Sequence, residues 1–309
     1  MKYKTYNCNS FNIYTIKTDR FKTSHLEVIF KNVLKKEEIG TYSFLADMLS
    51  EGCKKYPRKK DLITRFEELY KIVIYASTMR VGNVIDLHVS LDFINPEYIE
   101  DEGYIEDVIK TLFEVINNPN VCNDEFDLKT FNIVKERLRR EINSLKENPV
   151  KQSIKEAIKT MDSNSPTSYE ILGTIEELEN ITPAKLYDAY KSLRKNFKVD
   201  VFLIGNLDMD NVASLIKKYF KNRYIVSDNF EVMVDNKETK KVKEKTMKSD
   251  NIQTNLVMLF NLKNLSELEK NITLNCFNYL YGSGGLTSKL YKSIREENSL
   301  CYAINSMYL

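Results

Sequence analysis

Hydrophobic and polar residues alternate along two stretches in the first third of the chain, and this alternation predicts β-strands. Apolar side chains occupy every second position of residues 26–30 and again of residues 85–93. The two histidines of the chain fall out of phase with the apolar positions, His25 directly before Leu26 and His88 between Leu87 and Val89. We therefore expect two half-buried strands whose imidazoles point away from the core into solvent.

A helical period appears where apolar residues recur three or four positions apart. Residues 131–149 carry such a stripe, which predicts a long amphipathic helix. Residues 199–208 read as a strand that leads into a turn, and residues 212–220 then give a second helical stripe. Asp208 or Asp210 is suited to cap the start of that helix.

The chain turns polar and lysine-rich after this helix, which suggests a break between two domains. We expect a first domain over residues 1–220, a polar linker over residues 221–250 and the start of a second domain over residues 251–309. Both domains begin with a strand, a helix and a glycine that ends it. This similarity hints at a duplicated unit.

The second domain is predicted in more detail from its pattern. Residues 256–260 alternate like a strand, and residues 266–281 read as a helix that ends at a glycine-rich turn. A further helix then ends near Arg295, and a strand opens at Leu300.

Composition and charge narrow the class of protein. The 309 residues include 46 basic and 44 acidic side chains, so a net charge of +2 gives no general attraction to nucleic acid. No apolar run reaches the ~20 residues that a membrane helix needs. The five cysteines are odd in number, form no Cys-x-x-Cys and are expected to stay reduced. Without a signal-type apolar segment at the N-terminus, we expect a cytoplasmic location.

Arg295 and Tyr302 flank the connection between the last predicted helix and strand. A guanidinium can hold a peptide carbonyl or carboxylate through two parallel hydrogen bonds, and a phenol can donate to a developing oxyanion. The pair is therefore suited to gripping a polypeptide. The alternative is an exposed arginine at a helix end beside a half-buried strand tyrosine.

The whole segment around this pair resembles the second-domain signature of the insulinase-type (pitrilysin-like) zinc peptidases. That signature is a Gly-Gly-Gly turn, Ser-x-Leu, and Leu-Arg-Glu-x-x-x-Leu-x-Tyr. The matching residues here are Gly-Ser-Gly-Gly at 282–285, Ser-Lys-Leu at 288–290 and Ile-Arg-Glu through Leu-Cys-Tyr at 294–302. The resemblance implies that Arg295 and Tyr302 bind the substrate backbone opposite a zinc ion.

The zinc helix of that family, with its His-x-x-Glu-His motif, corresponds to residues 40–52. The frame agrees with the family's Gly-x-x-His-Phe-Leu-Glu-His-Met-x-x-x-Gly, but Ser43, Ala46 and Asp47 occupy the three chemical positions. A neutral hydroxyl and one carboxylate make a poor zinc pair, and Ala46 cannot take a proton from water. We therefore expect no metal on this chain.

The family's third zinc ligand is a glutamate on a later helix, and it has a counterpart here. Residues 131–149 resemble Phe-x-x-x-Lys-x-x-Leu-x-x-Glu-Ile-x-x-x-x-Asp-x-Pro, which aligns Glu141 with that ligand. Glu141 lies at the edge of the apolar stripe. Without imidazoles nearby, we expect it to be held by hydrogen bonds rather than to bind metal.

Together these features predict an α+β fold with two related domains, the second truncated. Each domain is expected to have a mixed, mainly antiparallel sheet with helices on one face. The resemblance implies a non-catalytic subunit of a bacterial two-subunit peptidase, whose partner carries the zinc and whose substrate is a peptide or protein. It is most similar to the bacterial insulinase-like proteins associated with the aminopentanol modification of elongation factor P. No nucleic acid or membrane partner is expected.

Two other functions stay open from the sequence. One is a self-sufficient zinc peptidase that uses Glu141, Asp47 and a further ligand. The other is an interaction scaffold without a substrate role, in which Arg295 and Tyr302 could be replaced without consequence.

Overall fold

The structure is a computed structural model, and it describes residues 3–221, 241–248, 252–262 and 264–308. The described residues group into two units. The first runs to residue 221 and includes the described part of 242–258, and the second comprises Lys241 and the described residues from Leu259 onward. Most of the predicted linker over 221–250 lies outside the described residues. The predicted domain boundary at residue 251 stays a prediction.

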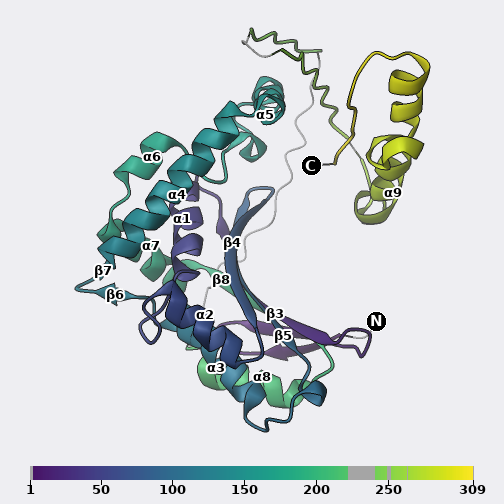
Figure 1. Cartoon of the computed structure of the whole chain (residues 1–309). Coiled ribbons are helices and arrows are strands. Elements are labelled where there is room, and N and C mark those ends of the chain that lie inside the picture. The colour runs from purple at the N-terminus through teal and green to yellow at the C-terminus, as the bar shows by residue number, and fades with distance from the viewer. Residues whose placement is uncertain (1–2, 222–240, 249–251, 263, 309) are drawn as a thin grey trace. The chain divides into compact units, whose positions relative to one another are not determined.

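A six-stranded sheet forms the centre of the first unit (Figure 1). Its strands lie in the order β1-β2-β8-β3-β5-β4. Only β2 and β8 run parallel, and the other neighbours are antiparallel. This arrangement confirms the predicted mixed, mainly antiparallel sheet. The strands are β1 (Lys4–Asn7), β2 (Asn12–Lys17), β3 (Thr23–Val33), β4 (Val73–Val81), β5 (Val84–Ile94) and β8 (Lys198–Gly205), and a separate hairpin pairs β6 (Val121–Cys122) with β7 (Glu125–Phe126).

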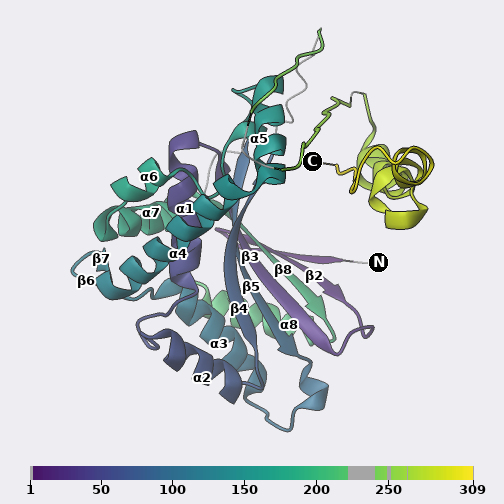
Figure 2. The same ribbon diagram turned by 45° about the horizontal axis from the view of Figure 1, so that its top comes forward.

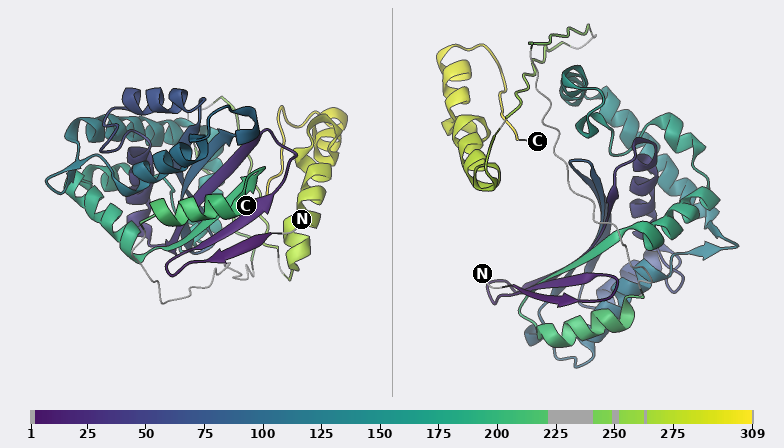
Figure 3. Two further views of the ribbon diagram at one scale, coloured as in Figure 1. Left: turned by 90° about the horizontal axis from the view of Figure 1, so that it is seen from below. Right: turned by 180° about the vertical axis from the view of Figure 1, so that it is seen from behind.

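Helices cover one face of this sheet, as Figures 1 and 2 show. Helix α1 packs against β4 and β5, α3 against β5, and α8 against β2. The other face carries no helix of the described first unit, and we call it the helix-free face (Figure 3). The helices are α1 (Ile39–Leu49), α2 (Lys59–Glu68), α3 (Tyr104–Asn117), α4 (Leu128–Glu147), α5 (Pro149–Met161), α6 (Ile175–Asn180), α7 (Pro183–Asn196) and α8 (Met209–Tyr219), with short 3-10 turns η1 (Lys36–Glu38), η2 (Pro96–Tyr98) and η3 (Pro166–Ser168).

The alternation of residues fixes the register of the two long central strands. Leu26 and Val28 of β3 lie opposite Leu91 and Val89 of β5, and all four side chains are fully buried. A shift by one residue would turn this whole apolar set to the other face. The register is therefore set by the core.

Both histidines point away from this core, as predicted, but His88 is not a solvated side chain. Its side chain is 13% exposed, and its Nδ1 lies 2.9 Å from the Glu27 carboxylate. His25 is more open and pairs with Asp92 at 2.7 Å. The pattern of one strand predicts which face a residue is on, but not how far neighbouring strands cover that face.

Side-chain caps begin several helices where the sequence offers Asp, Asn or Thr. Asp208 accepts a hydrogen bond from the Asn211 amide at the start of α8, which decides between the two candidate caps. Asp127 accepts from the Thr130 amide at the start of α4. Each such cap satisfies an amide that has no partner within its helix.

The second unit is helical among its described residues. Its elements are the π-helical turn η4 (Glu269–Thr273), α9 (Leu274–Asn278), the π-helical turn η5 (Tyr279–Ser283), the 3-10 turn η6 (Gly285–Thr287) and the π-helical turn η7 (Tyr291–Glu297). The strands predicted at residues 256–260 and from Leu300 do not form within the described part of the chain. A strand requires a hydrogen-bonded neighbour, and neither segment has one there.

The contact between α1 and α4 should dominate the stability of the first unit. Phe44 is fully buried and stacks on Phe131 with ring centroids 4.8 Å apart. We predict that Phe44→Ala lowers the free energy of unfolding by about 3–5 kcal/mol, because it removes an aromatic side chain from a packed core. Urea denaturation followed by circular dichroism measures the change.

Ile133→Ala is the matched control, because Ile133 lies on α4 with its side chain 55% exposed. It should change the free energy of unfolding by no more than about 0.5 kcal/mol. Equal effects of the two substitutions would show that the α1–α4 contact does not hold the unit together.

Candidate functional site

Helix α1 carries the three positions that correspond to the zinc motif. Ser43 and Asp47 are four residues apart and therefore lie on one face of the helix. The helix is deeply packed, and Ser43 and Ala46 are only 5% and 1% exposed. Any chemistry at these positions must take place inside the contact that α1 makes with β4 and α4.

The Ser43 hydroxyl forms hydrogen bonds with two neighbouring residues. It donates to the carbonyl oxygen of Ile171 at 2.5 Å and lies 2.7 Å from the Thr78 hydroxyl on β4. Because a hydroxyl has one proton, Ser43 must accept from Thr78 if it donates to Ile171. Its oxygen therefore ties α1 to β4 and to the loop before α6.

Asp47 is part of a network of charges between α1 and α4. The Arg137 guanidinium of α4 lies 3.2 Å from the Asp47 carboxylate and donates to the Glu51 carboxylate at 2.7 Å. Lys59 lies 3.7 Å from the same Glu51 oxygen. Burial raises the pKa of Asp47 above its ordinary value, and the positive charge of Arg137 opposes that rise. The carboxylate is thus balanced by a guanidinium that belongs to the protein.

Glu141 does not behave as the sequence predicts. It is exposed on α4, while its neighbours Leu138 and Ile142 are buried. Among the described residues it has no hydrogen-bond partner, so the expectation that hydrogen bonds hold it is wrong. The reason is its position, because a residue one step before a buried Ile142 turns about 100° away from it around the helix.

These residues do not fit a zinc ion. Zinc in proteins takes thiolate, imidazole or carboxylate ligands. Here Ser43 offers an engaged hydroxyl, Ala46 offers no polar atom, and the Asp47 carboxylate faces the Arg137 cation. In the described parts of the chain, no group of three or more His, Cys, Asp or Glu side chains is arranged to hold a metal.

The sequence did not identify Arg137, Glu51 or Thr78 as part of this region. A partial signal was available, because Glu51 follows Asp47 by four residues, the spacing at which helical side chains share a face. In the structure Glu51 lies just beyond the end of α1. Their partner Arg137 lies far along the chain, and only the packing of α4 on α1 brings it there. Such a partner cannot be read from local spacing.

In the second unit, the structure brings Arg295 and Tyr302 together. The Arg295 guanidinium lies 5.1 Å from the centroid of the Tyr302 ring and 4.8 Å from that of the Tyr291 ring. Tyr302 is 81% exposed, so its hydroxyl is accessible. Sequence reasoning missed Tyr291, although its spacing of four residues from Arg295 places both on one side of the helical turn.

Close packing explains why a glycine is needed in the turn before this pair. A Cβ atom at Gly282 would lie 2.3 Å from the Ser306 hydroxyl oxygen and 2.9 Å from a Leu290 methyl carbon. Gly282 therefore lets the segment after Tyr302 approach the preceding helical turns. Ser306 completes the contact by donating to the Asn278 side chain at 2.6 Å.

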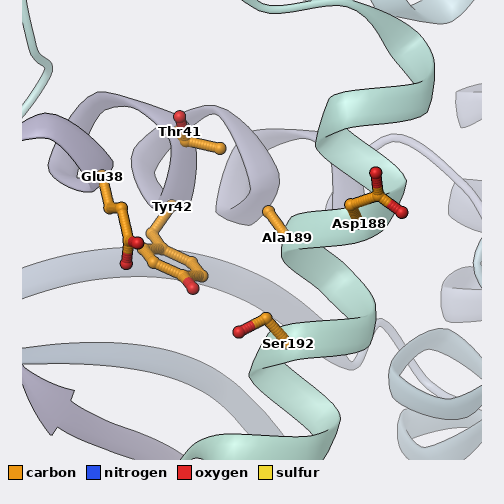
Figure 4. Close-up of a pocket in the computed structure, with 6 residues that line it drawn as sticks. All are labelled: Glu38, Thr41, Tyr42, Asp188, Ala189 and Ser192. Atoms are coloured by element: carbon orange, nitrogen blue, oxygen red, sulfur yellow. The ribbon is translucent and has the colours of Figure 1, made fainter.

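A hollow of about 250 Å³ lies between the start of α1 and α7 (Figure 4). Burial raises the pKa of Tyr42 in its wall, and a hydrogen bond with Ser192 opposes that rise. None of the site residues predicted from the sequence lines this hollow. The lining residues are Glu38, Thr41, Tyr42, Asp188, Ala189 and Ser192.

None of the described helices is long and apolar enough to span a bilayer.

Comparisons with known proteins agree with this fold. The family model described as the peptidase M16 inactive domain matches residues 180–308. A probable inactive metalloprotease of Bacillus subtilis (strain 168), YmfF, is 26% identical over 292 residues, which cover 93% of this chain and 67% of that protein. An uncharacterized zinc protease of the same organism, YmfH, is 25% identical over 114 residues, or 37% of this chain and 26% of that protein.

A solved structure shares the fold over nearly the whole chain. It is a conserved protein from Enterococcus faecalis V583, with a TM-score of 0.85 and 22% identity. The match covers 99% of this chain and 72% of that one. The chain is thus similar to the insulinase-type M16 peptidases, and its residues 180–308 match the inactive domain of that family.

Proposed function

We propose that this chain is the non-catalytic subunit of a two-chain zinc peptidase. It holds the peptide substrate through Arg295 and Tyr302, while a partner of the same family supplies the zinc and the general base. The observation that carries the proposal is a contrast between two sites. The side chains at the metal positions on α1 contact Thr78, Ile171 and Arg137, whereas Tyr302 of the Arg–Tyr pair is open to solvent and Arg295 is half-buried.

The chemistry of the pair supports a substrate role. A guanidinium can bind a peptide carbonyl or a carboxylate through two hydrogen bonds, and the phenol can donate to an oxyanion. The contact between Arg295 and the Tyr302 ring keeps the two donors close together. This reduces the loss of side-chain entropy when a substrate binds. Neither group can activate water at neutral pH, so the chain needs a partner for hydrolysis.

The relatives support the pairing. Bacillus subtilis has both a protein described as a probable inactive metalloprotease and one described as a zinc protease, and this chain is similar to both. In a pair of that kind, the inactive chain would bind the substrate and the zinc protease would supply the zinc, as proposed here. We place the complex in the cytoplasm and take a peptide or protein as its substrate. A link to elongation factor P modification stays a prediction from the sequence.

Zinc content provides a first test. Because Ser43 and Ala46 supply no ligand and Asp47 faces a guanidinium, the purified chain should hold well below one zinc per molecule. Inductively coupled plasma mass spectrometry measures this content, with a family member that has an intact His-x-x-Glu-His motif as the positive control. Glu141→Gln should leave the value unchanged. A tightly held stoichiometric zinc that disappears in Glu141→Gln would instead support a self-sufficient peptidase.

The Arg–Tyr pair provides a second test, measured as peptide hydrolysis by the complex with the zinc-bearing partner. Tyr302→Phe should lower kcat by about 10²–10³-fold, because it removes one donor to the oxyanion. Arg295→Ala should also raise KM, because its contact is made in both the ground state and the transition state.

Tyr308→Phe is the matched control, because it removes a hydroxyl from the same terminal segment, where Tyr308 is 46% exposed. It should leave both kinetic constants unchanged. If Tyr302→Phe and Arg295→Ala also assemble and cleave normally, the substrate role is wrong, and the scaffold function replaces it.

A further inference from the structure

The guanidinium of Arg295 lies against two tyrosine rings in the second unit. Its central carbon is 4.8 Å from the centroid of the Tyr291 ring and 5.1 Å from the centroid of the Tyr302 ring. Both distances are within the ~6 Å at which the negative face of an aromatic ring attracts a cation. The proposed function gives Tyr302 a role as a hydrogen-bond donor and gives Tyr291 none.

Local hydrogen bonds hold the backbone of Tyr291 at the start of η7. Its amide donates to the Ser288 hydroxyl oxygen at 3.4 Å, and the Lys292 amide donates to the Ser288 carbonyl oxygen at 3.1 Å. Ser288 is 1% exposed, so this anchor is itself buried. Tyr291 and Arg295 are four residues apart in η7, which places their side chains on one side of the helical turn.

A sharp reversal of the chain brings Tyr302 to the same guanidinium. Ser299 has a φ of +52°, in the left-handed region where helices commonly end. Its amide donates to the Arg295 carbonyl oxygen at 3.0 Å, and the Leu300 amide donates to the Ile294 carbonyl oxygen at 3.0 Å. The backbone after η7 is thus tied to the end of the helical turn, and Tyr302 follows directly.

These ring contacts leave the N–H groups of Arg295 available. Among the described residues, its side chain has no carboxylate or carbonyl partner, and attraction to a ring face does not use up a guanidinium's several donors. Arg139 of α4, by contrast, pairs with Glu136 three residues before it. The residues three and four positions before Arg295 are Lys292 and Tyr291, so no acid competes from that side of η7.

An arginine held in place has an advantage in binding. A free arginine side chain populates many rotamers, and a ligand that fixes it must overcome the entropy lost. Arg295 is restricted by two rings before any ligand arrives, and the Tyr291 ring extends from an anchored backbone.

We propose that Tyr291 is a positioning residue for Arg295, whose guanidinium it holds ready to donate to a peptide. The face of the aromatic ring carries this role, and the hydroxyl group does not. The inference rests on the proposed function only for what Arg295 then binds. The contact itself can be tested without a partner chain and without a substrate.

The first experiment measures the mobility of the Arg295 side chain in the full chain alone. With nitrogen-15-labelled arginine, the Nε–H signal of Arg295 is identified by its loss in Arg295→Lys. Its heteronuclear nuclear Overhauser effect reports motion on the picosecond-to-nanosecond timescale. Tyr291→Phe keeps the ring and should leave the value unchanged, whereas Tyr291→Leu should lower it toward that of a freely moving side chain.

Tyr279→Leu is the matched control, because it removes a ring from the same unit at a position that is 61% exposed. It should leave Arg295 as restricted as in the unmodified chain. Tyr291→Met is a second variant in case Tyr291→Leu fails to fold, since methionine also favours a helix. Equal mobility of Arg295 in the unmodified chain and in a folded variant without the ring would overturn the proposal. An equal loss of order in Tyr291→Phe and Tyr291→Leu would also overturn it, because the hydroxyl would then carry the role.

Peptide hydrolysis by the complex with the zinc-bearing partner measures the consequence. Tyr291→Leu should raise KM by about 2–5-fold and leave kcat unchanged, as expected for the loss of one cation–π contact at an exposed site. In an Arg295→Ala background the same substitution should have no further effect, because Tyr291 acts through Arg295. A purely structural residue would show its effect in both backgrounds.

The two experiments separate two kinds of failure. If Arg295→Ala leaves both kinetic constants unchanged, the proposed substrate role is wrong, and the mobility of Arg295 still decides whether Tyr291 positions it. If Arg295→Ala raises KM but Tyr291→Leu does not, or if the effects of the two substitutions add, the substrate role stands and the positioning role is wrong.

Discussion

The burial of α1 is the constraint on which the rest of the first unit depends. Nine of its eleven residues are buried, so almost every side chain must either pack or find a hydrogen-bond partner. Gly40 allows a close contact with the backbone before α6, because a Cβ atom there would lie 3.0 Å from the Gly173 Cα. That approach brings the Ile171 carbonyl to Ser43, and the same helix face brings Asp47 to Arg137. The interactions that seat the helix are therefore the ones that close the metal positions.

The sequence predicted the parts of the fold that depend on local pattern. The inward-facing residues of β3 around Val28, the amphipathic helix α4 and a cap of α8 at Asp208 or Asp210 are all visible from spacing and residue type. The order of the six strands was not predicted, because it depends on contacts between distant segments. The strand expected from Leu300 failed for the same reason, since its formation depends on a neighbour rather than on its own residues.

The candidate site, too, was predicted from the sequence only in part. The absence of imidazoles at Ser43, Ala46 and Asp47 was predicted from the resemblance of residues 40–52 to the family's zinc motif. The guanidinium of Arg137 beside Asp47, the exposed position of Glu141 and the pairing of His88 with Glu27 were not. Each of these depends on how one element packs on another, and a single sequence records that packing only indirectly.

The central claim is that this chain takes part in peptide hydrolysis without performing the chemistry. The most direct measurement is the cleavage of a fluorogenic peptide by this chain, by its zinc-bearing family member, and by an equimolar mixture of the two. The account predicts cleavage by the mixture and little or none by either chain alone. Cleavage by this chain alone, or a zinc-bearing member that is as fast without this chain as with it, would contradict the account.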